Sequence, residues 1–170
     1  GAAKERWLML NLELRPLQEN DAPAIDRILR QTGMFTAAEI DVANELIDIF
    51  LHKPDQKDYV IVAAFEPSAP IEPVGYVCFG PTPATEATFD LYWIAVAPAR
   101  QGQGIGQTLL NHAEQESVSR GGRLMIIETS SKAIYLPTQK FYERNGYVVE
   151  ARIKDFYAQG DDRLIYTRRF

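Results

Sequence analysis

The sequence predicts one α/β domain whose sheet is mixed but mostly antiparallel, with a central parallel β-α-β crossover and helices on both faces. Its 170 residues suit a single domain. Hydrophobic residues make up 46% of the chain, which is enough apolar surface for a folded core. Strand-length and helix-length runs follow the order β-α-α-β-β-β-α-β-α-β-β. Only the central β-α-β unit needs a parallel crossover, because strands joined by short turns pair antiparallel.

The N-terminal part of the chain is expected to form one strand and two helices. Residues 10–17 alternate apolar and polar side chains, as a half-buried strand does. Thr36 and Glu39 form a capping box at the start of the second helix. Residues 1–9 are interpreted as an added or flexible extension, so that the domain itself spans residues 10–170.

Proline-rich and glycine-rich stretches separate the remaining elements. The run 89–96 has few polar residues, which indicates a central strand. Glu128 and Thr129 are expected to end a short buried strand that precedes them. The expected strands are 59–65, 74–79, 89–96, 124–127, 147–153 and 164–169, and the expected helices are 104–120 and 134–144.

Charge and cysteine content narrow the class of protein. The chain has 23 acidic and 18 basic residues, and its net charge of −5 argues against a general nucleic-acid binder. No run approaches the roughly 20 apolar residues that cross a bilayer, so we expect no membrane partner. The single cysteine, Cys78, favours a reducing compartment, and we expect the protein in the cytoplasm.

The charge is unevenly distributed along the chain. Residues 19–91 hold 13 acids and 4 bases, a net charge of −9. Residues 92–170 hold 11 bases and 8 acids, a net charge of +3. The second part therefore favours an anionic ligand, and the first favours a cationic one.

A glycine-rich turn joins the apolar strand 89–96 to the amphipathic helix 104–120. Three glycines at alternate positions let the backbone approach a ligand closely. The helix N-terminus adds unpaired N–H groups and the positive end of the helix dipole. Together these features predict a cradle for a pyrophosphate, whereas a plain tight turn needs only one glycine. The turn reads Arg100-Gln101-Gly102-Gln103-Gly104-Ile105-Gly106.

Two other phosphate-binding motifs fit this turn poorly. A P-loop requires a lysine after its last glycine, and none follows here. A dinucleotide fingerprint requires a third glycine where this chain has Gln107 or Leu109. Glu128, which lies 22 residues past Gly106, stands near the place of a ribose-binding acid. A nicotinamide-dependent oxidoreductase therefore remains a disfavoured alternative.

Two segments resemble the signatures of the GNAT family of N-acetyltransferases. The stretch 101–106 is similar to the family motif Gln/Arg-x-x-Gly-x-Gly/Ala. The stretch 141–147 is similar to an aromatic-Tyr-x-x-x-Gly-aromatic signature that the family carries near its end. The two lie at family-like separation with one strand between them, and the order of elements matches over residues 10–170.

The resemblance implies acetyl-coenzyme A as co-substrate and no metal. In the family, the backbone amides of the glycine loop hold the pyrophosphate. The strand before the loop splays from its neighbour and pairs with the pantetheine arm through its backbone. Arg100 is interpreted either as a positive charge at the mouth of this site or as a solvated loop residue. The corresponding positions are Ile94, Ala95, Val96, Arg100, Gln101, Gly102, Gln103, Gly104, Ile105, Gly106 and Gln107.

The resemblance also implies catalytic roles. Tyr142 matches the tyrosine that protonates the leaving thiolate, although an aromatic packed on the sheet is the structural alternative. The backbone amide of Val96 is expected to polarise the thioester carbonyl. Two carboxylates, Asp90 and Glu128, are candidates for the base that deprotonates the amine, directly or through water. Many members carry asparagine where this chain has Tyr135, which is expected near the adenine or at the acceptor.

In the family, the acceptor binds between the first helix pair and the last hairpin. Here those segments are 32–36 and 155–162, and they contribute three aromatic side chains, Phe35, Phe156 and Tyr157. Aromatic rings and carboxylates together suit a cation. Asp161 and Asp162 belong to a Gln-Gly-Asp-Asp stretch that is typical of a solvated β-turn.

The function that the sequence supports is N-acetyl transfer from acetyl-coenzyme A to a primary amine of a small molecule or peptide, by direct attack. An acyl-coenzyme A sensor without catalysis on the same fold is the alternative from another class. The resemblance leaves a homodimer open, because dimers are common in the family.

Overall fold

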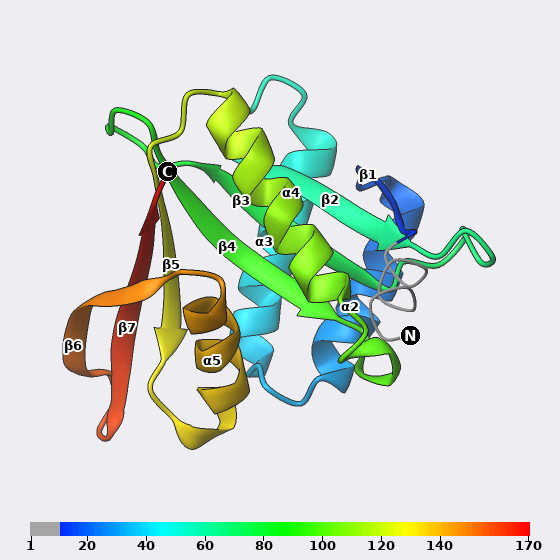
Figure 1. The fold of residues 1–170 in the computed structure, drawn as a ribbon. Helices are drawn as coiled ribbons and strands as arrows, with labels where there is room; N and C mark the ends of the chain where they lie inside the picture. The colour runs from blue at the N-terminus through cyan, green and yellow to red at the C-terminus, as the bar shows by residue number, and fades with distance from the viewer. Residues whose placement is uncertain (1–10) are drawn as a thin grey trace, which may run out of the picture.

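Seven strands form one sheet in the order β1-β2-β3-β4-β5-β7-β6 in the computed structural model, which describes residues 11–170 (Figure 1). Neighbouring strands are antiparallel except β4 and β5, which are parallel. The predicted mixed, mostly antiparallel sheet with one parallel crossover is therefore confirmed.

The elements follow the predicted order. The strands are β1 (Glu13–Pro16), β2 (Val60–Phe65), β3 (Gly75–Pro81), β4 (Thr88–Val96), β5 (Leu124–Ser130), β6 (Val148–Ala158) and β7 (Asp161–Arg169). The helices are α2 (Ala22–Gln31), α3 (Ala37–His52), α4 (Ile105–Ser119) and α5 (Leu136–Arg144). Short 3-10 helices are η1 (Glu19–Asp21), η2 (Pro98–Arg100) and η3 (Ala133–Tyr135).

Local sequence signals explain several boundaries. The side chain of Thr36 accepts a hydrogen bond from Glu39 N–H, and Glu39 accepts one from Thr36 N–H, so the predicted capping box opens α3.

The predicted extension, residues 1–9, lies outside the described residues. Among residues 11–170, no helix is both long and apolar enough to cross a membrane.

Three strands near the C-terminus are longer than the sequence indicated. β5 continues through Glu128 and Thr129, which were expected to end it, to Ser130. It does so because β7 pairs with it along its full length, as far as Ser130 opposite Arg163. The final hairpin likewise extends to a tight connection at residues 159–160. Cross-strand pairing, which hydropathy alone does not reveal, lengthens these strands.

Helices cover both faces of the sheet. α4 lies in front of the sheet in Figure 1, while α2 and α3 lie behind it. One buried cluster combines residues of α4 and α5 with strand residues such as Val77, Leu91 and Ile127. A second buried cluster packs α2 and α3 against the other face, around Tyr76 and Cys78. The strands therefore separate two apolar cores.

β4 and β5 are paired over only part of their lengths. Their parallel register runs from Thr88 opposite Leu124 to Leu91 opposite Ile127. Beyond that point β4 continues along β3, and β5 continues along β7. We call this unpaired stretch, residues 92–96 of β4 and 128–130 of β5, the β4–β5 opening. It is the splay that the family resemblance implied, and the two strands diverge there in Figure 1.

A buried glycine in β3 provides a test of this packing. A Cβ at Gly80 would lie 1.9 Å from the carbonyl oxygen of Asp58, which is backbone. We expect Gly80→Ala to lower the free energy of unfolding by about 2–3 kcal/mol, because the backbone must shift. Urea unfolding monitored by circular dichroism measures the effect.

Gly106→Ala is the matched control. Its added Cβ would meet neighbouring side chains at 3.7 Å, which is ordinary contact. An alanine in a helix is also more stable than a glycine by roughly 0.5–1 kcal/mol. Equal stability of the two variants would contradict the close approach described at Gly80.

Candidate functional site

The glycine loop forms an anion cradle at the start of α4. Gly102 has φ 78° and Gly104 has φ 87°, a left-handed conformation that favours glycine. The first helical backbone bond runs from Thr108 N–H to Gly104 C=O at 3.0 Å. The N–H groups at residues 105–107 precede this bond, so they lie at the positive end of the helix dipole without helical acceptors. This geometry suits a pyrophosphate.

α5 packs against the start of α4. A Cβ at Gly106 would contact both Phe141 of α5 and Val96 at the end of β4. The side-chain amide of Gln107 donates a hydrogen bond to the side-chain oxygen of Asn145, which follows α5. The two segments that carry the family signatures therefore meet where β4 ends.

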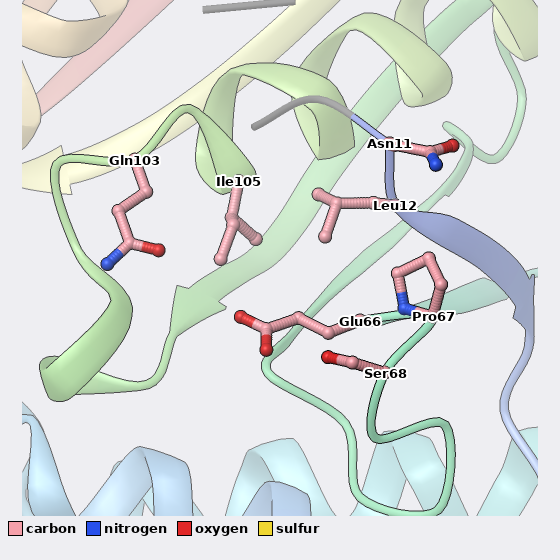
Figure 2. Close-up of a pocket in the computed structure, with 7 residues that line it drawn as sticks. All are labelled: Asn11, Leu12, Glu66, Pro67, Ser68, Gln103 and Ile105. Atoms are coloured by element: carbon pink, nitrogen blue, oxygen red, sulfur yellow. The ribbon is translucent and has the colours of Figure 1, made fainter. Parts of the chain in front are cut away.

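The charged and amide side chains of the glycine loop contact different parts of the chain. Arg100 forms an ion pair with Glu66 at 3.0 Å, after β2. Gln101 donates weakly to the carbonyl oxygen of Val96 at 3.4 Å. Gln103 lines a cavity of about 200 Å³, and Figure 2 shows how the residues around this cavity lie. This cavity lies toward β1 and β2 rather than β5, and its lining residues are Asn11, Leu12, Glu66, Pro67, Ser68, Gln103 and Ile105.

The backbone of β4 alternates between β3 and the β4–β5 opening. Ala97 N–H donates to Val74 C=O at 2.8 Å, and Ala95 lies opposite Tyr76. Antiparallel pairing therefore turns the backbone groups of Ala95 toward β3. The N–H groups of Ile94 and Val96 then face the opening, while the carbonyl groups of these residues face the same way.

Tyr142 lies in α5 on the α4 side of the sheet. Its side chain is 4% exposed, and its ring packs against those of Phe141, Tyr147 and Tyr166. Burial raises the pKa of Tyr142 well above the usual value of a tyrosine. The hydroxyl group therefore stays protonated at neutral pH, as a proton donor must.

The two candidate carboxylates lie at different positions. Asp90 is in the paired part of β4, opposite Ile126, and accepts hydrogen bonds from the hydroxyl groups of Thr82 at 2.6 Å and Tyr92 at 3.3 Å. Glu128 is on the β5 side of the opening, where it forms an ion pair with Arg163 of β7. The structure thus places Glu128, and not Asp90, at the opening.

Aromatic residues lie near the β4–β5 opening on the side of the sheet that α2 and α3 cover. Phe35, in the loop between α2 and α3, packs edge-to-face on Trp93 of β4 with ring centroids 5.2 Å apart. The hydroxyl group of Tyr135 donates to the carbonyl oxygen of Met34 at 2.8 Å. Tyr135 therefore joins η3 to the α2–α3 loop, which places it on the expected acceptor side.

The final hairpin supplies two more rings to this side. Phe156 and Tyr157 pack edge-to-face with centroids 5.0 Å apart. The guanidinium group of Arg163 lies 4.7 Å from the ring centroid of Phe156. Burial together with the Asp161 and Glu39 carboxylates raises the pKa of Tyr157. Burial and the same two carboxylates also raise the pKa of Tyr135.

The expectation that Asp161 and Asp162 form a solvated turn is wrong. Both residues start β7 and are only 6% and 7% exposed. Asp161 accepts a hydrogen bond from the hydroxyl group of Ser130 and pairs with Lys132 at 3.6 Å. Asp162 pairs with Arg152 and accepts a hydrogen bond from a backbone N–H, both of which lower its pKa. Strand pairing next to the hairpin turn includes residues whose composition is typical of a turn.

Sequence reasoning did not single out Trp93 or Arg163. Trp93 was assigned to the core with its strand, and no local signal shows that β4 is unpaired on one side there. Arg163 lies just before the predicted strand 164–169, and its partner on β5 is 35 residues away in the sequence, so no local signal marks the ion pair.

Comparison with known families identifies the chain's relatives. The model of the acetyltransferase (GNAT) domain matches residues 56–149, which include β4, the glycine loop and α5. A comparison with curated proteins found no significant match.

Solved structures show the same fold. An acetyltransferase of the GNAT family from Desulfovibrio desulfuricans is 45% identical, with 93% of this chain and 98% of that chain covered and a TM-score of 0.87. An aminoglycoside 6′-N-acetyltransferase in complex with coenzyme A is 18% identical, with coverage of 92% and 96% and a TM-score of 0.71. An N-acetyltransferase from Thermoplasma acidophilum, also with coenzyme A, is 20% identical, with coverage of 94% and 99% and a TM-score of 0.71.

Proposed function

The chain belongs to the GNAT family of acetyltransferases, and we propose that it moves the acetyl group of acetyl-coenzyme A directly to a primary amine of a small molecule or peptide. The observation that carries this proposal is the β4–β5 opening. It connects the glycine loop and Tyr142 on one side of the sheet with Phe35, Tyr135 and the final hairpin on the other. A donor and an acceptor that enter from opposite sides meet there.

The donor site is proposed to use backbone groups rather than charged side chains. The N–H groups of residues 102–107 would hold the pyrophosphate. The unpaired backbone of Ile94 and Val96 would bind the pantetheine arm as an added strand does. Two structures of this fold contain coenzyme A, which supports this assignment. Because Arg100 is paired with Glu66, it contributes to this site only if that ion pair opens.

In the proposed reaction, the amine nitrogen forms a bond to the thioester carbonyl carbon and the carbon–sulfur bond breaks. The N–H of Val96 would stabilise the negative charge that develops on the carbonyl oxygen. Tyr142 would give its hydroxyl proton to the leaving sulfur, and its raised pKa keeps that proton available. The proton lost by the amine would pass to Glu128 or to water.

Glu128 is the better-placed base of the two candidates. It lies at the opening on the acceptor side, whereas Asp90 lies in the paired part of the sheet with two hydroxyl donors. Arg163 fixes the position of the Glu128 carboxylate from the neighbouring strand. This carboxylate faces the side from which the acceptor would arrive.

The glycine loop provides the first test. We expect Gly104→Glu to weaken coenzyme A binding at least about tenfold, because it puts a carboxylate into the anion cradle. Gly121→Glu is the matched control, since Gly121 has φ 85° at the other end of α4 with nothing near its added Cβ. Isothermal titration calorimetry gives both affinities, and thermal unfolding confirms that both variants fold.

If Gly104→Glu bound coenzyme A as tightly as the wild type, the assignment of the glycine loop to the coenzyme site would be wrong. Release of free thiol from acetyl-coenzyme A in the presence of a primary amine tests the transfer itself. Tight coenzyme binding without thiol release across a panel of amines would instead favour a sensor on this fold.

Tyr142 provides the second test. We expect Tyr142→Phe to lower kcat about 100-fold while coenzyme affinity changes little, since only a proton donor is lost. Tyr166→Phe is the control, because its hydroxyl group donates to Glu143 rather than lying on the reaction path, and its kcat should stay within about twofold. An unchanged kcat in Tyr142→Phe would exclude the acid role.

The raised pKa of Tyr142 also predicts a pH profile. A phenol with a raised pKa keeps its proton up to at least about pH 10, the usual pKa of tyrosine. We therefore expect no fall in wild-type kcat between neutral pH and about pH 9.5 from loss of this proton. A steep fall in that interval that is absent from Tyr142→Phe would contradict the raised pKa of Tyr142 and not its role as the acid.

The two carboxylates can be separated by amide substitution. We expect Glu128→Gln to lower kcat at neutral pH at least about tenfold, since the amide cannot accept the proton. Asp90→Asn should stay within about threefold of the wild type. Steady-state kinetics with saturating acetyl-coenzyme A measure both, and the reverse ranking would assign the base to Asp90.

A further inference from the structure

We propose that the acceptor is a monoamine that carries an aromatic or similarly flat apolar group, rather than a polycation. This inference rests on the proposed acetyl transfer and specifies the substrate class for the same site. It follows from the surface formed by five aromatic side chains, here called the aromatic arc, and from the charges around it. The arc consists of Phe35, Trp93, Tyr135, Phe156 and Tyr157.

Contacts between neighbouring segments connect the parts of the arc. It begins on β4, where Trp93 packs against Phe35. The Tyr135 hydroxyl is bonded to the residue before Phe35. Asp161, four residues after Tyr157, pairs with Lys132, three residues before Tyr135, which brings the final hairpin beside η3.

The arc ends beside the proposed base. Tyr157 packs on Phe156, and the ring of Phe156 lies under Arg163. Arg163 in turn holds Glu128. An aromatic group lying on the arc would therefore have its attached amine within reach of the carboxylate at the opening.

The two rings of the arc that lie on the final hairpin are unusually exposed for large aromatic side chains. Phe156 and Tyr157 are each 47% exposed, although they are large apolar rings. Adjacent exposed rings in a molecule with two filled cores mark a binding surface. Aromatic rings bind other flat groups by offset stacking or edge-to-face contact, worth roughly 0.5–1.5 kcal/mol per pair beyond burial.

The charges around the arc argue against a polycation. Each acid that lies near the rings already has a partner within the chain: Asp161 has Lys132, and Glu128 has Arg163. Glu39 accepts the backbone N–H of Thr36 in the capping box. Two of these three carboxylates, Asp161 and Glu128, are therefore neutralised by basic side chains of the same chain where the acceptor would bind.

Arg163 already occupies a position on the arc where a cation would bind. Its guanidinium group lies over Phe156, where a cationic group of an acceptor would otherwise be attracted. A second ammonium group on the acceptor would have to displace this guanidinium group from the Phe156 ring, whereas a neutral ring would not. The opening would therefore accommodate one amine, and an apolar group would fit the rest of the site better than a second charge.

The test compares three acceptors with the wild-type protein: 2-phenylethylamine, hexylamine and 1,4-diaminobutane. Thiol release gives kcat/KM, and mass spectrometry confirms the acetylated product. We expect kcat/KM for 2-phenylethylamine to exceed that for 1,4-diaminobutane at least about tenfold, with hexylamine between them. A higher value for the diamine would overturn the inference and leave acetyl transfer standing. Transfer to a peptide amine but to none of the three would overturn the inference alone, and the absence of thiol release with amines of either kind would overturn both.

Substitutions in the arc test the contact itself. Tyr157→Ala should raise the KM for 2-phenylethylamine about tenfold and leave the KM for acetyl-coenzyme A unchanged, while Tyr157→Phe should restore it because the ring remains. Ile71→Ala is the control, since Ile71 is 90% exposed on the turn between β2 and β3. Unchanged KM for 2-phenylethylamine in Tyr157→Ala, with a folded protein, would exclude the arc as the acceptor surface.

Discussion

The end of pairing between β4 and β5 after Leu91 and Ile127 is the constraint on which the rest of the site depends. Each strand has another neighbour, β3 or β7, that keeps it in the sheet after they separate. The separation therefore leaves one row of backbone groups on β4 without a strand partner. An extended ligand can satisfy those groups, because it pairs with them as a strand would.

The two faces of the sheet supply different chemistry to this opening. On the α4 side, the ligand would meet backbone N–H groups and a buried tyrosine, Tyr142. On the other side, it would meet aromatic rings and the carboxylate of Glu128. A helix start can hold an anion without charged side chains, so Arg100 is free to pair with Glu66. In the proposed function, this arrangement would keep donor and acceptor apart until they meet at the opening.

Net charge along the sequence was an incomplete guide to the acceptor. Residues 19–91 are strongly acidic, and the last hairpin adds Asp161 and Asp162. In the folded chain, bases from the C-terminal part pair with the hairpin acids, as Lys132 and Arg152 do. The proposed acceptor surface therefore combines aromatic rings with hairpin acids that bases of the same chain neutralise, although these residues are separated in the sequence.

The sequence by itself determined the order of elements, the capping box at Thr36 and the glycine loop, because each depends on neighbouring residues or a local period. It also determined the family, through two short motifs. Only the tertiary structure decided that Arg163 pairs with Glu128, and that Asp161 is buried. These outcomes depend on which strands pair and where pairing stops, and those contacts join residues far apart in the chain.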